Sequence, residues 1–106
     1  MATQQDDIME IAREFIKSLK ESGFSVYEAY LFGSALTGNF TSESDIDVAV
    51  VAKEFQGIPF YDLQKVSRLR RKIDLRLEIH PFSLNDIQHD SSAFYREIQQ
   101  SGFRLD

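Results

Sequence analysis

Hydrophobic and polar residues follow one another along this chain with two different periods, which predict both helices and strands. In residues 4–22 the apolar side chains recur every three or four positions, the spacing of one face of an amphipathic helix. Acidic residues stand near the start of this segment and lysines near its end, as the helix dipole favours, and Gly23 follows as a stop signal. We expect a helix here whose role is packing.

Two further segments predict the first strands. Residues 24–32 are rich in apolar and aromatic side chains, which we expect in the core rather than on a base-stacking surface, because RNA-binding aromatic residues usually have basic neighbours. Residues 46–51, IDVAVV, are mostly β-branched, which favours an extended segment. Successive strand side chains point to opposite faces, so Asp45 and Asp47 share one face.

The second half of the chain predicts a helix, a strand and two short helices. Residues 60–72 carry apolar positions at helical spacing, and residues 73–79 alternate strictly between apolar and polar side chains, as in a half-buried strand ended by Pro81. Ser83 is a helix cap, and Gly102 ends the last helix. The residues after Gly102 give no prediction.

In this order the elements predict one domain of the α+β class, an α/β sandwich with helices packed on a small mixed β-sheet. A chain of 106 residues is large enough for a single core. The helix at 60–72 supplies the crossover that two parallel strands require.

Composition and charge narrow the function classes. The chain has no cysteine, its first residues are acidic rather than basic, and no apolar run reaches the roughly 20 residues of a membrane span, so we expect a cytoplasmic protein without membrane contact. A net charge of −5 argues against broad nucleic-acid binding. A small substrate that brings its own Mg²⁺, or a protein target, fits better, and homo-oligomer formation stays open.

The candidate chemistry lies between the first two predicted strands. The carboxylates of Asp45 and Asp47 would repel each other unless a cation lay between them, and oxygen ligands at that density suit Mg²⁺ together with substrate phosphates. Gly33 and Ser34 open a short segment that ends at Gly38, where backbone N–H groups and the serine hydroxyl suit phosphate. These residues predict a site for Mg²⁺ and a nucleoside triphosphate.

Together the two halves of this site match a known signature. The pattern G-S-x(3)-G-x(5)-S-D-x-D resembles that of the DNA polymerase β-type nucleotidyltransferases, and more closely that of the minimal nucleotidyltransferase (MNT) domains of bacteria and archaea, over about residues 30–82. Its members here are Gly33, Ser34, Gly38, Ser44, Asp45 and Asp47. Ser44 either orients the neighbouring carboxylate or simply precedes the strand. The alternative for the whole segment is ordinary loop chemistry, which leaves two acids on one strand face unexplained.

The resemblance implies a third acid on a neighbouring strand, which completes the metal set and acts as base toward the acceptor hydroxyl. Asp74 and Glu78 both fit. Asp74 matches the hydrophobic-Asp-Leu form that is usual in minimal nucleotidyltransferases, whereas Glu78 would serve if the strand register set it beside Asp47. We favour Asp74. The catalytic set is then Asp45 and Asp47 with Asp74 or Glu78, and the metal ligands are Asp45, Asp47 and Asp74.

The resemblance further implies transfer of AMP from ATP to a hydroxyl, with pyrophosphate released. Domains of this kind act beside a helical HEPN-type protein as the antitoxin of a toxin–antitoxin pair, so we expect such a partner to carry the acceptor. Two other functions stay open: a non-catalytic partner-binding module with a vestigial nucleotide site, and an adenylyltransferase of a small molecule such as an antibiotic. A basic cluster at residues 68–72 either ends a helix in solvent or helps to neutralise phosphate.

Overall fold

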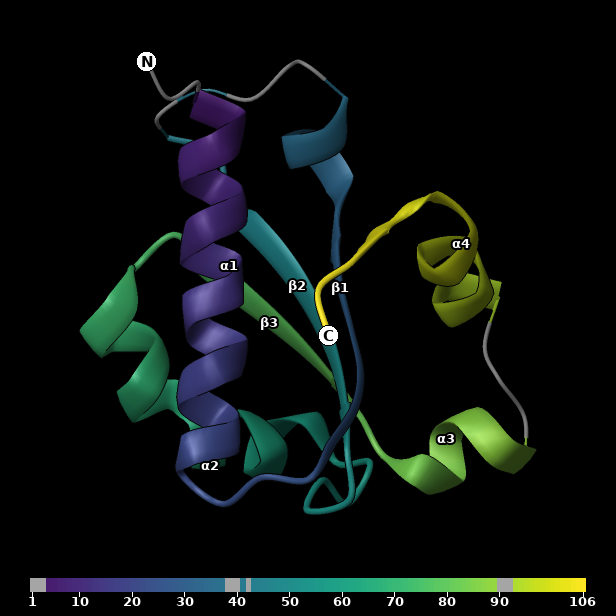
Figure 1. Cartoon of the computed structure of the whole chain (residues 1–106). Coiled ribbons are helices and arrows are strands. Elements are labelled where there is room, and N and C mark those ends of the chain that lie inside the picture. Colours follow the sequence, from purple (N-terminus) through teal and green to yellow (C-terminus); the bar gives the residue numbers. More distant parts are fainter. Residues whose placement is uncertain (1–3, 38–40, 42, 90–92) are drawn as a thin grey trace.

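The computed structural model describes residues 4–37, 41, 43–89 and 93–106, and these form four α-helices, one 3₁₀ helix and four strands (Figure 1). None of the described helices combines the length and the apolar character needed to cross a membrane. In chain order the elements are α1 (Gln4–Glu21), β1 (Val26–Phe32), η1 (Gly33–Leu36), β2 (Ile46–Ala52), α2 (Pro59–Ile73), β3 (Leu77–Phe82), α3 (Leu84–His89), α4 (Ala93–Ser101) and β4 (Phe103–Arg104).

The strands form one mixed sheet in the order β3-β2-β1-β4. The pairs β1–β2 and β1–β4 are antiparallel, whereas β2 and β3 run parallel and are joined by the crossover through α2. This arrangement confirms the predicted α+β fold with a mixed sheet. It also makes β2 a central strand, which explains why six of its seven residues are buried.

Helices α1 and α2 cover one face of the sheet, where the main core lies (Figure 1). The apolar stripe of α1 packs there on one side chain in two along β2, and α2 adds Val66, which is fully buried. The apolar residues whose periodicity predicted α1 therefore form the helix face that the sheet covers. At about 25 cal/mol per Å² of apolar surface, burial of this stripe is the main stabilising contribution.

The opposite face of the sheet carries α4 and leaves the rest of its area free for polar groups. Ile98 of α4 is buried against Tyr30 and Ala49. At the edge of this contact Glu28 accepts hydrogen bonds from the hydroxyls of Tyr30, at 2.6 Å, and Tyr95, at 2.9 Å. Burial and the bond to Glu28 raise the pKa of Tyr95, so this hydroxyl stays protonated and fixes α4 on the strand.

The third strand begins later than the alternation of residues 73–79 predicts. Helix α2 continues to Ile73, and Asp74 then caps a turn in which its Oδ1 accepts the backbone N–H of Arg76 at 2.8 Å. Strand β3 therefore starts at Leu77 and includes Pro81, which an edge strand tolerates because one side of its backbone needs no partner.

The C-terminal residues form a strand that the sequence did not predict. Phe103 and Arg104 pair with β1 in antiparallel fashion. Gly102 ends α4, as expected, because its N–H bonds the carbonyl of Ile98 at 2.7 Å and a Cβ there would lie 2.5 Å from the same oxygen. Ser83 caps α3 as predicted, since its Oγ accepts the N–H of Asp86 at 3.0 Å.

A buried carboxylate holds the loop between β2 and α2. The side chain of Asp62 is fully buried, and its two oxygens accept the backbone N–H groups of Gln56 at 2.8 Å and Gly57 at 2.9 Å. These bonds satisfy two donors that would otherwise be unpaired at the start of α2.

Replacement Asp62→Ala should lower the free energy of unfolding by about 3 kcal/mol, because both N–H groups lose a charged acceptor. Urea unfolding of the variant and of Glu10→Ala, an exposed acid on α1, provides the comparison. The Glu10 variant should stay within about 0.5 kcal/mol of wild type. Equal stability of the two variants would contradict this role of Asp62.

Candidate metal and nucleotide site

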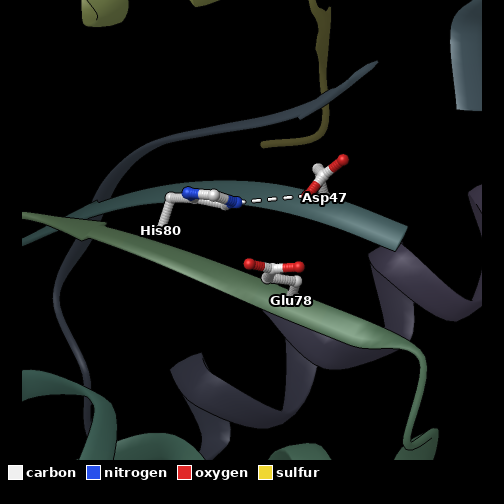
Figure 2. A group of neighbouring side chains, drawn as sticks. All are labelled: Asp47, Glu78 and His80. Carbon is white, nitrogen blue, oxygen red and sulfur yellow. Dashed lines mark hydrogen bonds and ion pairs between the residues drawn. The ribbon is translucent and has the colours of Figure 1, made fainter. Parts of the chain in front are cut away.

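The parallel pairing of β2 and β3 brings acidic side chains together on the face of the sheet that α1 and α2 do not cover. In the register Asp47 lies opposite Glu78, and Ala49 lies opposite His80. Figure 2 shows Asp47 on β2 and Glu78 and His80 on β3, with the three side chains on the same side of the two strands. Each offers one ligand atom, and these atoms all lie within 4.8 Å of one another.

Asp45 extends this group at the start of β2. It is exposed and directly precedes the strand, two positions before Asp47. Asp45 and Glu78 line the same hollow on the surface. We refer to Asp45, Asp47 and Glu78 as the acid cluster.

The acid cluster raises the pKa of Glu78. Hydrogen bonding with the Asp45 carboxyl is the largest cause, followed by burial and by the negative charges of Asp45 and Asp47, while His80 acts in the opposite direction. The Glu78 carboxyl therefore resists ionisation unless a cation neutralises the neighbouring negative charges. Their donor set fits Mg²⁺, which prefers carboxylate oxygens.

His80 lies beside the acid cluster and orients one of its members. Its Nε2 is 3.2 Å from Oδ1 of Asp47, and the two side chains are only about one quarter exposed, 26% and 22%. This contact fixes the rotamer of Asp47 and leaves Oδ2 for another ligand. One sequence signal points to His80, since it stands two positions after Glu78 in a segment of alternating apolar and polar residues.

The Gly33-Ser34 turn faces the same carboxylate from β1. Gly33 has a φ of +79°, a conformation that side chains disfavour, and a Cβ there would lie 2.6 Å from Oδ2 of Asp47. The turn therefore approaches the acid cluster as closely as a backbone can. Ser34 follows in the 3₁₀ helix η1, and its carbonyl accepts the N–H and the hydroxyl of Thr37 at 3.2 and 3.1 Å.

Asp74 does not lie on β3, contrary to the prediction. It caps the end of α2, and its two oxygens accept the Nε and Nη2 of Arg76 at 3.1 and 3.0 Å. The hydrogen bond from Arg76 lowers the pKa of Asp74, so this acid has a cation of its own. Glu78, the alternative, is the residue that the register sets beside Asp47.

The structure describes the contacts of some of the remaining predicted site residues. The Oγ of Ser44 accepts the N–H of Thr41 at 3.1 Å, so it stabilises the loop before β2. Gly38 lies outside the described residues. In the basic segment, Arg70 donates to the carbonyls of Leu75 at 2.9 Å and Leu77 at 3.1 Å and thereby fixes the start of β3.

The raised pKa of Glu78 predicts a pH-dependent stability. A carboxyl whose pKa is higher in the folded than in the unfolded chain stabilises the fold when protonated, and this contribution is lost as the pH rises through the folded value. Glu78→Gln should therefore be more stable than wild type at pH 7 by less than about 1 kcal/mol, given its exposure, and the gain should vanish at pH 4. Thermal unfolding at both pH values tests this. A gain that is equal at both would contradict repulsion within the acid cluster.

Solved structures of several proteins resemble this fold. A Sulfolobus solfataricus protein described as a nucleotidyltransferase matches with a TM-score of 0.62 and 25% identity, over 78% of this chain and 73% of its own. A toxin–antitoxin structure with AMP-PNP matches with a TM-score of 0.62 and 24% identity, over 89% and 72%. A variant of the MntA–HpeT toxin–antitoxin matches with a TM-score of 0.57 and 26% identity, over 88% and 69%.

Among curated proteins none matches this chain. The sequence model of the family described as "Polymerase beta, Nucleotidyltransferase" matches residues 14–105, which include α2, all four strands, the Gly33-Ser34 turn and the acid cluster. The fold, the signature residues and this match all indicate the same family. The chain belongs to the polymerase β nucleotidyltransferase family.

Proposed function

We propose that this chain is a Mg²⁺-dependent nucleotidyltransferase that transfers AMP from ATP to a hydroxyl group on a partner protein, as the antitoxin of a pair with a helical HEPN-type toxin. The observation that carries the proposal is the approach of the Gly33 turn to the Asp47 carboxylate within an acid cluster completed by Glu78. A phosphate-binding turn and a metal-binding set of acids side by side are what nucleotidyl transfer requires.

Each part of the site has one task in this reaction. Asp45, Asp47 and Glu78 would hold Mg²⁺, which when bound neutralises the phosphate charge and stabilises the transition state. Gly33 and Ser34 bind the β- and γ-phosphates through backbone N–H groups and the serine hydroxyl. The acceptor oxygen bonds the α-phosphorus, the bond to the β-phosphate oxygen breaks, pyrophosphate leaves, and the hydroxyl proton passes to Glu78.

A protein acceptor is supported by the surface beside Glu78. A hollow of about 310 Å³ there is lined by three charged residues, Asp45, Arg70 and Glu78, and by apolar side chains that include Leu63 and Leu75. Leu75 is 71% exposed and Leu63 38%. Exposed leucines next to a reaction centre suit the apolar surface of another protein better than a polar small molecule.

The similar structures add support for the partner and the nucleotide. Two of those described above are toxin–antitoxin structures, and one of these was solved with AMP-PNP, an analogue of ATP. We infer from them the class of partner and the adenine nucleotide for this chain.

Replacement Glu78→Gln should reduce the transfer rate by about a hundredfold or more, because the acceptor hydroxyl loses its base. Asp74→Asn should leave the rate near that of wild type, since its Oδ1 still accepts the N–H of Arg76. The measurement is incorporation of label from [α-³²P]ATP into the partner protein. The opposite result, loss in the Asp74 variant alone, would assign the base to Asp74.

Replacement Gly33→Ala should abolish Mg²⁺-dependent ATP binding, because the new Cβ displaces the carboxylate of Asp47. Gly23→Ala is the matched control: its φ of +99° imposes a similar backbone strain of about 1–2 kcal/mol, yet no atom lies within 4 Å of the new Cβ. The free energy of unfolding should fall by a similar amount in both variants, and only the Gly33 variant should fail to bind ATP. ATP binding that survives in both would contradict the role of this turn.

The partner itself is tested by co-expression with the protein encoded beside this chain. We expect the two proteins to copurify, and mass spectrometry should find AMP on a hydroxyl side chain of the partner only when the acid cluster is intact. Copurification without any modification would instead favour a binding module. A small-molecule acceptor is favoured if labelled AMP reaches aminoglycosides rather than the partner.

A further inference from the structure

A second pocket opens on the same face of the sheet, between the 3₁₀ helix η1 and α4. Its volume is about 430 Å³, within the range of about 300–1,000 Å³ that is usual for small-molecule sites. It is lined by Phe32, Gly33, Leu36, Thr37, Phe94, Glu97, Ile98 and Ser101. Only Gly33 has a role in the proposed transfer, so the α4 side of the pocket is without an assigned ligand.

The pocket and the acid cluster share a wall. Phe32 is the direct partner of Asp47 in the β1–β2 register, and its ring centroid is 5.0 Å from that of His80, which contacts Asp47. Gly33, at the mouth of the pocket, approaches the same carboxylate. A molecule whose phosphates lie at Gly33 and Asp47 therefore has its other end within reach of this pocket.

Phe94 provides a fixed aromatic surface on α4. Its ring is held by three others, with centroid distances of 5.8 Å to Phe32, 5.9 Å to His80 and 6.3 Å to Phe82. Nevertheless 45% of Phe94 is exposed. An exposed ring that its neighbours immobilise is a suitable stacking partner for a flat ligand such as a nucleobase, because little conformational entropy is lost on binding.

The polar side chains of the pocket favour a ligand rich in hydrogen-bond donors. The hydroxyl of Thr37 donates to the carbonyl of Ser34 at 3.1 Å, and that of Ser101 donates to the carbonyl of Glu97 at 2.8 Å, so both oxygens are left as acceptors. The carboxylate of Glu97 only accepts when ionised. No lysine or arginine is among the described lining residues, so this pocket suits the nucleoside rather than the triphosphate.

We propose that this pocket holds the nucleoside of the nucleotide substrate, with the base on Phe94 and the ribose hydroxyls and an exocyclic amino group toward Thr37, Glu97 and Ser101. The inference rests on the proposed function, which sets the phosphates at the acid cluster. It adds the residues that would select the adenine nucleotide: a base with an exocyclic amino group, such as adenine, binds better than uracil, which has none.

The test is calorimetric titration of Mg²⁺-ATP, Mg²⁺-UTP and Mg²⁺-tripolyphosphate into wild type and three variants. Phe94→Ala should weaken ATP about tenfold and leave tripolyphosphate unchanged. The matched control is Phe60→Ala, a phenylalanine on α2 that is 67% exposed and should leave both affinities unchanged. Glu97→Gln, at an exposed position, should reduce the preference of wild type for ATP over UTP.

Two results would overturn the inference, and only one of them would also contradict the proposed function. If Phe94→Ala and Glu97→Gln both bind ATP and UTP as wild type does, the nucleoside lies elsewhere, while binding of tripolyphosphate leaves the phosphate site intact. If wild type binds neither ATP nor tripolyphosphate with Mg²⁺, the proposed function fails together with the pocket. Circular dichroism of each variant excludes loss of the fold as the cause.

Discussion

The site depends on one constraint, the parallel register that sets Glu78 opposite Asp47. Two carboxylates at adjacent strand positions, with Asp45 close by, oppose folding unless a cation or a proton neutralises them. The pKa of Glu78 is raised because its neighbours disfavour a further negative charge. The main core, which is buried on the other face of the same sheet, compensates for this unfavourable repulsion.

This division between the two faces explains the arrangement of the helices. Helices α1 and α2 cover one face of the sheet, where the main core lies, so the opposite face can carry polar and charged groups (Figure 1). There α4 covers only part of the sheet and leaves Asp47 and His80 partly exposed. Two hollows, one toward Leu75 and one toward Phe94, lie beside the acid cluster, and in the proposed function they would give acceptor and nucleoside separate approaches.

How far the sequence predicts this structure depends on whether a feature is local. The helical periodicity of α1 follows from spacing alone and is found. The shared face of Asp45 and Asp47 is likewise a prediction from spacing alone. The predicted start of β3 was wrong, because the apolar–polar alternation of residues 73–79 continues through the end of α2 and the turn that follows it. Asp74 stabilises this turn by accepting hydrogen bonds from Arg76. Which of Asp74 and Glu78 lies beside Asp47 depends on the pairing of β2 with β3, which no local pattern contains.

Other features are equally non-local. Strand β4 has two residues, too few for any period, and it exists because β1 offers a free edge. The pocket between η1 and α4 is lined by Phe32 and Phe94, which come together only when α4 packs on the sheet. In contrast, the pair Gly33-Ser34 is a local signal, and the structure sets Gly33 close to the carboxylate of Asp47.

The most direct test of the central claim is calorimetric titration of ATP into wild type and into the double variant Asp45→Asn, Asp47→Asn, each with and without Mg²⁺. The account predicts that wild type binds ATP only with Mg²⁺ and that the folded double variant does not bind. Binding of equal strength in both proteins, or in wild type without Mg²⁺, would contradict a metal and nucleotide site at the acid cluster.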